Sequence, residues 1–166
     1  MAEPYLEPWL RGPVSGVDPV VGALLNSFQH TREDLARWTQ CIGDEDVWKN
    51  PHGLASLGFE LRHIAASVGR LMTYASGGQL DAAQLALLKR ESEPGESLAS
   101  LMAALDASFD EAAVLARSFN PSEFGALRFI GRKRLPVPLA GLLVHIAEHT
   151  QRHTGQAILI AKILRT

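Results

Sequence analysis

The densest group of side chains that could do chemistry lies near the C-terminus, where His145, His149 and His153 fall within nine residues. Their spacing of four residues places them on one face of a helix. Two imidazoles at this spacing can bind one metal ion, but the outer two would lie about 12 Å apart along the axis. The helix therefore supplies two ligands at most, either His145 with His149 or His149 with His153. Glu148 directly precedes His149, so the zinc-protease arrangement of two histidines around a glutamate is not present.

A third ligand must come from a neighbouring helix, and His63 is the best candidate because it falls in the middle of a predicted helix. The same face continues through Ser67, Arg70 and Tyr74, at offsets of four, seven and eleven residues. Polar groups inside a helix bundle cost free energy unless they are paired or bind a ligand. We therefore expect this stripe to line a site. Three histidines around a metal would leave a coordination position open for water or substrate, as in catalytic metal sites.

The elements that must position these residues are helices. Apolar residues recur at helical spacing in four long segments and one short segment. The predicted long helices are 18–41, 56–77, 96–118 and 138–164, the short one is 81–90, and residues 43–53 are expected to form a loop. A short hairpin or extended loop is expected over 122–137. These segments predict an all-α fold, a four-helix up-down bundle that buries the apolar stripes.

The length of 166 residues fits one domain, which we expect to span 18–166 after an N-terminal arm of residues 1–17. The arm contains three prolines, and Tyr5, Leu6 and Trp9 are candidates for packing it against the bundle. The single cysteine, Cys41, cannot form an intrachain disulfide and is expected to be a small buried apolar residue.

Charge and hydropathy disfavour several classes of protein. The net charge is −2, which makes nucleic acid an unfavoured partner despite the four basic residues within 128–134. No apolar run approaches the roughly 20 residues that span a bilayer, so no membrane partner is expected. The acidic N-terminus lacks the features of a secretory signal, which predicts a cytoplasmic protein.

Two segments carry a resemblance to a known family. SLGFELRHIAASVGRLMTYASG at 56–77 places a histidine in the middle of the second long helix, and LLVHIAEHTQRHTGQ at 142–156 contains the spacing H-x3-H-x3-H-x-G-Q. With the order of the helices, they make residues 18–164 similar to the DinB-like, or YfiT-like, four-helix proteins.

The resemblance implies a bundle with a crossover between its second and third long helices. It also implies a divalent metal, with zinc or nickel favoured and iron as a further candidate, bound by His63, His149 and His153. His145 matches the first histidine of the pattern but is not usually a ligand, so it would line the site together with Ser67. Thr154 stands where arginine is common in relatives.

The family resemblance leaves two functions open. Some relatives transfer low-molecular-weight thiols such as bacillithiol or mycothiol, which implies a metal-dependent thiol S-transferase or a related hydrolase. Arg70 and Arg152 are then candidates for fixing a substrate carboxylate and Tyr74 for donating a proton. The alternative is a non-enzymatic, stress-associated metal-binding protein. In either case we expect a homodimer with two-fold symmetry.

Overall fold

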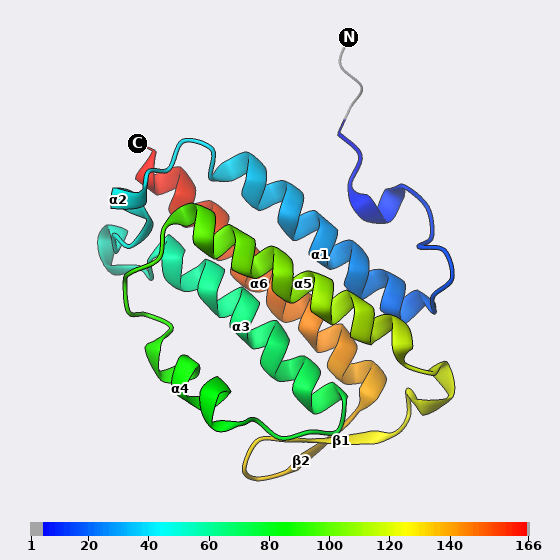
Figure 1. The fold of residues 1–166 in the computed structure, drawn as a ribbon. Coiled ribbons are helices and arrows are strands. Elements are labelled where there is room, and N and C mark those ends of the chain that lie inside the picture. The colour runs from blue at the N-terminus through cyan, green and yellow to red at the C-terminus, as the bar shows by residue number, and fades with distance from the viewer. Residues whose placement is uncertain (1–4, 166) are drawn as a thin grey trace.

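Four long helices form the body of the molecule. The computed structural model describes residues 5–165. The long helices are α1 (Pro19–Trp38), α3 (Leu57–Ala75), α5 (Leu98–Ser118) and α6 (Leu139–Leu164), and they lie side by side as a bundle (Figure 1). The all-α fold predicted from the apolar periodicity is therefore confirmed, with boundaries within three residues of those expected.

The starts of three long helices follow from their capping residues. Asp18, Ser56 and Ser97 each precede a helix and accept a hydrogen bond from a main-chain N–H of its first turn. Such caps satisfy donors that have no partner inside the helix, typically contributing about 1 kcal/mol. Helix α6 instead follows Pro138, the last residue of the preceding strand, and has no side-chain cap.

The long helices α3 and α5 follow one another in the chain but are parallel rather than antiparallel. Helix α1 packs against α6, and α3 packs against both α5 and α6. Helices α3 and α5 run in the same direction because a crossover brings the chain back to the end of the bundle where α3 began (Figure 1). The crossover contains α4 (Ala82–Arg90), close to the predicted 81–90. Its N-terminus is closed by a capping box in which Asp81 and Gln84 exchange side-chain-to-backbone hydrogen bonds.

A two-stranded hairpin connects α5 to α6 at one end of the bundle (Figure 1). Strand β1 (Leu127–Ile130) pairs antiparallel with β2 (Leu135–Pro138), so that Leu127 faces Pro138 and Phe129 faces Pro136. Gln79, in the crossover, donates a hydrogen bond to the main-chain oxygen of Phe129 at 3.1 Å. The hairpin expected over 122–137 is therefore present.

The core is apolar and continuous through the bundle. It is centred on Phe28 of α1 and Phe109 of α5, whose rings stack with centroids 4.4 Å apart. The fully buried aliphatic side chains come from all four long helices: Leu24, Leu35, Leu57, Leu61, Ile64, Leu105, Leu139, Leu142, Leu143 and Ile146. Within residues 5–165, no helix is long and apolar enough to cross a bilayer.

Two expectations about residues near α1 were wrong. Cys41 is exposed, and the neighbouring Ile42 is buried in its place. Residues 43–53 do not form a simple loop, because they contain a short helix α2 (Asp44–Val47) and a 3-10 turn η2 (Pro51–Gly53). The turn at Asp44–Val47 buries Val47 completely, which gives this segment an apolar anchor.

The arm is held by Pro8 and Arg11 besides the expected Tyr5, whose ring lies 5.8 Å from the Arg11 guanidinium. Tyr5, Leu6 and Trp9 are about half exposed. Pro8, in the 3-10 turn η1 (Pro8–Leu10), is buried instead. Arg11 makes a bidentate ion pair with Glu33 of α1, both contacts being 2.6 Å. The part of the arm at residues 1–4 lies outside the described residues.

Candidate metal centre

Three histidines converge between α3 and α6. His63 comes from α3, and His149 and His153 come from successive turns of α6. One possible ligand atom from each lies within 4.8 Å of the others. The Nε2 atoms of His63 and His149 are 3.0 Å apart, and the ring of His153 lies 4.3 Å from that of His63 and 4.5 Å from that of His149 between centroids. This is a suitable spacing for donors that share one ion.

The electrostatics of the cluster keep His149 neutral. The pKa of His149 is lowered to about 4, and burial is the largest cause. The positive charges of its neighbours lower it further; these neighbours are His153, His63, His145 and Arg152. A neutral imidazole has a lone pair on one nitrogen and can bind a metal without first releasing a proton. At neutral pH His149 is therefore ready to act as a ligand.

A buried carboxylate lies behind His63. Glu91 follows α4 in the crossover, is only 4% exposed, and has its Oε2 atom 2.7 Å from His63 Nδ1. Burial tends to raise the pKa of Glu91, but hydrogen bonds from His63 and Arg70 outweigh burial and lower it. An ionised carboxylate can only accept, so His63 donates from Nδ1 and keeps its lone pair on Nε2, the atom nearest His149.

A second buried carboxylate lies behind His153. Glu60, one turn before His63 on α3, is 3% exposed, and its Oε2 atom is 2.7 Å from His153 Nδ1. As a carboxylate, Glu60 accepts a hydrogen bond from this nitrogen, which leaves the lone pair of His153 on Nε2. Gln156 also donates to Glu60 at 3.2 Å when its amide nitrogen faces the carboxylate. Burial raises the pKa of Glu60, and the contact with His153 opposes this rise.

Of the three polar residues that follow His63 on the same face of α3, only Arg70 is linked to the histidine cluster. Arg70 is buried and forms an ion pair with Glu91, so it contacts the site through that carboxylate. Ser67 is buried and donates to the carbonyl oxygen of Ile64 in its own helix at 3.1 Å. Tyr74 is eleven residues beyond His63, which is about 16 Å along the helix axis. The structure therefore brings Arg70 to the edge of the cluster, satisfies Ser67 locally and places Tyr74 far from the histidines.

The two remaining candidates lie on the exposed side of α6. The ring of His145 is 5.6 Å from that of His149, and its side chain is 47% exposed. Arg152 is similarly exposed and forms an ion pair with Glu148 at 2.6 Å, while His145 contacts the same carboxylate at 3.7 Å. Both residues are accessible beside His149, and Arg152 would have to leave Glu148 to contact a substrate.

Thr154, which stands where arginine is common in relatives, is turned away from the histidines. It is fully buried between α6 and α1, where its hydroxyl lies 3.0 Å from that of Thr31. Thr154 therefore belongs to the α1–α6 interface, where its hydroxyl has a partner on α1.

The donor set fits a divalent metal. It consists of three imidazoles, two of which have their second nitrogen hydrogen-bonded to a carboxylate, as metal-bound histidines commonly do. Within residues 5–165, this is the only group of three or more histidine, cysteine or acidic residues close enough to hold an ion. Zinc, nickel and iron all accept imidazole ligands.

Sequence reasoning missed both carboxylates. The position of Glu60 near the histidines could have been inferred from the sequence, because it lies three residues before His63 and hence on nearly the same helix face. Glu91 had none, since its position depends on how the non-periodic crossover folds back on α3.

Comparison with known proteins places the chain in a family. The family model of the DinB superfamily matches residues 27–157, which is well over half the sequence and includes all three histidines. No curated protein matches the sequence. The family match, the bundle with its crossover and the histidine cluster agree with one another: the chain belongs to the DinB superfamily.

Proposed function

We propose that this protein binds one divalent metal ion through His63, His149 and His153. The observation that carries the proposal is the convergence of three imidazole donors from two helices, with ligand atoms within 4.8 Å of one another. Imidazole ligands and a half-buried site favour zinc or nickel, with iron as a further candidate.

The geometry favours a metal that takes part in chemistry. Within the described part of the chain the group has three protein ligands, which leaves a position for an exogenous molecule. A bound ion would supply Lewis acidity and stabilise a thiolate or a hydroxide at that position. His145 and Arg152 are exposed next to His149 and are our candidates to contact the substrate.

We infer that the reaction is transfer of a low-molecular-weight thiol to an electrophile, or a related hydrolysis. In the transfer, the thiol releases its proton to solvent, its sulfur forms a bond to the electrophilic carbon, and the bond from that carbon to the leaving group breaks, with the leaving group taking the electron pair. Arg152, released from Glu148, would pair with a carboxylate of the substrate. A cytoplasmic location and a homodimer stay predictions from the sequence.

The first experiment measures metal content. Untagged wild-type protein should contain close to one zinc, nickel or iron per chain by elemental mass spectrometry, and the His149→Ala/His153→Ala double variant should contain none. The matched control is His145→Ala, which removes an exposed histidine of the same helix and should retain the metal. A wild-type protein that takes up none of these metals, even after their addition, would refute the proposal.

The second experiment tests the reaction. Metal-loaded protein is assayed for conjugation of bacillithiol, mycothiol, glutathione and cysteine to an electrophile, and for ester hydrolysis. Turnover should disappear in the double variant and fall in Arg152→Ala. Binding of metal without turnover on any of these substrates would instead support the non-enzymatic alternative.

A further inference from the structure

The connector between α4 and α5, residues 91–97, delivers a carboxylate to the histidine cluster. Its first residue, Glu91, is buried against His63, whereas the next residues are exposed. The same carboxylate receives an ion pair from Arg70 through its other oxygen. Glu91 therefore joins the crossover to α3 at the cluster itself.

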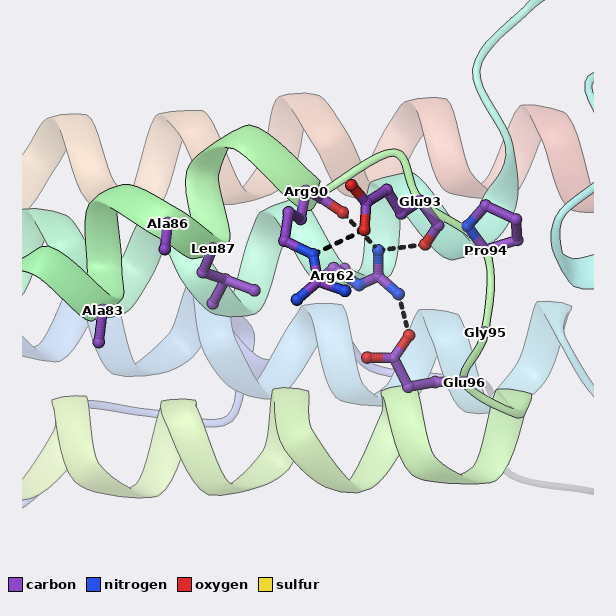
Figure 2. A pocket seen from close by; sticks show the side chains of 9 residues that line it. All are labelled: Arg62, Ala83, Ala86, Leu87, Arg90, Glu93, Pro94, Gly95 and Glu96. Carbon is purple, nitrogen blue, oxygen red and sulfur yellow. Dashed lines mark hydrogen bonds and ion pairs between the residues drawn. The ribbon is translucent and has the colours of Figure 1, made fainter.

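Arg62, one residue before His63, fastens the connector to α3. Its Nη1 atom donates to the main-chain oxygens of Arg90, Glu91 and Glu93 at 2.5–2.9 Å. Its Nη2 atom forms an ion pair with the Glu96 carboxylate (Figure 2). One guanidinium thus holds both ends of this short segment.

The connector has a second anchor on the other side of Arg62. Trp48 donates from its indole nitrogen to the main-chain oxygen of Glu96 at 2.8 Å, and the guanidinium of Arg62 lies over the Trp48 ring at 4.4 Å. Asp44 also accepts a hydrogen bond from the main-chain N–H of Leu98, at the start of α5. These contacts are polar and are made by side chains outside the connector.

Apolar packing contributes little to holding the connector. A pocket of about 490 Å³ separates it from α4, lined by Arg62, the α4 side chains Ala83, Ala86, Leu87 and Arg90, and residues 93–96 (Figure 2). Leu87, the largest apolar residue there, is 44% exposed. The position of Glu91 therefore depends on a few polar anchors, chiefly Arg62 and Arg70, rather than on the core.

We propose that Glu91 is a positioning residue for metal binding and that docking of the connector by Arg62 is energetically linked to occupation of the histidine cluster. This inference rests on the metal site proposed above. When the connector is docked, Glu91 fixes His63 with its lone pair on Nε2; when it is detached, His63 loses this partner. Ion binding and docking then favour each other by the same factor.

Glu60 supplies an internal comparison. It performs the equivalent contact with His153, but it is carried by α3 itself and does not depend on the connector. Loosening the connector should therefore impair the His63–Glu91 contact and leave the His153–Glu60 contact intact.

A double-mutant cycle tests the linkage. Zinc affinity is measured by competition with a chromogenic chelator for wild type, Glu91→Gln, Glu60→Gln and Arg62→Gln, and for Arg62→Gln combined with each glutamate variant. Loss of either carboxylate should weaken zinc binding about 10–100-fold. Arg62→Gln should weaken binding severalfold, although the hydrogen bonds of its guanidinium are to residues 90–96. It should have no further effect in the Glu91→Gln background and its full effect in the Glu60→Gln background.

The control is Glu93→Gln, which removes an exposed carboxylate of the same connector that pairs with Arg90. It should leave zinc affinity unchanged. If Arg62→Gln does not fold, Trp48→Phe replaces it in both backgrounds, because it removes the hydrogen bond to Glu96 and leaves only a smaller ring beside Arg62, and it should give the same pattern with a smaller amplitude.

Hydrogen exchange provides a readout that does not depend on activity. Zinc should slow amide exchange over residues 91–97 in wild type but not in Glu91→Gln. Zinc affinity unchanged by Glu91→Gln would overturn the positioning role, and equal effects of Arg62→Gln in both backgrounds would overturn the linkage. Failure of the wild type to bind zinc, nickel or iron would instead refute the proposed function.

Discussion

The hydroxyl groups of Thr31 on α1 and Thr154 on α6 lie 3.0 Å apart in the fully buried interface between the two helices. Thr154 donates its hydrogen to the carbonyl oxygen of Thr150 at 2.8 Å, so Thr31 must be the donor to Thr154. Thr31 in turn accepts from the amide nitrogen of Gln151 at 3.0 Å. This polar chain fixes the register of α1 against the helix that carries His149 and His153.

Replacing Thr31 by valine should destabilise the fold without affecting the metal centre. The variant keeps the side-chain shape but removes a donor and an acceptor inside a buried interface, which should lower the free energy of unfolding by about 1–2 kcal/mol. Denaturant unfolding measures the loss, and zinc competition should show unchanged affinity. Thr31→Ser retains the hydroxyl and should lose less; a larger loss in serine than in valine would argue against the hydrogen bond as the cause.

Removing the metal should lower the melting temperature. An ion that binds only the folded chain stabilises it by mass action, and this contribution disappears on chelation. Scanning calorimetry of metal-loaded and chelator-treated protein measures the shift, and the His149→Ala/His153→Ala variant should show none. Loss of any thiol-transfer activity together with the metal would support the enzymatic function. A shift without activity would support the non-enzymatic alternative, and an unchanged melting temperature would argue against a stabilising metal.

The stability of the metal-free protein should fall between pH 6.5 and pH 4 because of His149. Its pKa is lowered to about 4 in the folded state, while the unfolded chain takes up a proton near the ordinary value of about 6.5. The neutral ring therefore stabilises the fold fully above pH 6.5, and this contribution is lost as the pH falls toward 4. Chemical denaturation at pH 7.5 and pH 5 should show a larger loss for wild type than for His149→Gln. Equal losses would contradict the lowered pKa.

Gly58→Ala should displace Trp48 and weaken the fold. A Cβ atom on Gly58 would lie 2.7 Å from the indole ring, so the ring must shift. Overpacking of this kind lowers the free energy of unfolding by about 1–3 kcal/mol. The better helix propensity of alanine raises it by less than about 1 kcal/mol, so the net effect is destabilising. The matched control is Gly69→Ala in the same helix, whose Cβ would meet no atom within 4 Å. Denaturant unfolding should show loss of stability at residue 58 and a small gain at residue 69; equal responses would refute the steric argument.

Glu33→Gln should release the N-terminal arm. The hydrogen bond from Arg11 is the main cause that lowers the pKa of Glu33 to about 2, so the ion pair persists to acidic pH. Its contribution to folding is present above the ordinary carboxyl pKa and is lost as the pH falls toward 2. Limited proteolysis at neutral pH should cut the variant faster before α1 than wild type, with the bundle remaining intact. Equal cleavage rates would show that other contacts, such as buried Pro8, hold the arm.

The fold could be predicted largely from the sequence because its helices carry their own boundary signals. Apolar residues at helical spacing located all four long helices, and the structure shows a capping side chain at three of their starts. Cys41 was assigned to the wrong environment because the helix ends at Trp38 and the turn that follows directs Ile42 into the core instead. Such a turn has no period from which burial can be inferred.

The histidine cluster could be predicted less completely than the helices. The spacing of the histidines on α6 and the central position of His63 indicated a shared site, and the family resemblance selected His149 and His153 as the two ligands from α6. The polar stripe on α3 was a weaker guide, because burial does not say whether a polar group has a local partner, as Ser67 has, or a distant one. Tyr74 shows that a shared face is not a shared site when the residues are three turns apart.

The prolines of β2 limit the pairing of the hairpin with strands of other chains. Pro136 and Pro138 lie opposite Phe129 and Leu127, and neither has an N–H to offer to an additional strand. On the opposite edge, Gln79 occupies the main-chain oxygen of Phe129. Exposed apolar side chains on a short sheet would otherwise favour edge-to-edge aggregation. Because neither edge is free to pair with a further strand, the hairpin can expose apolar side chains without forming a larger sheet with neighbouring molecules.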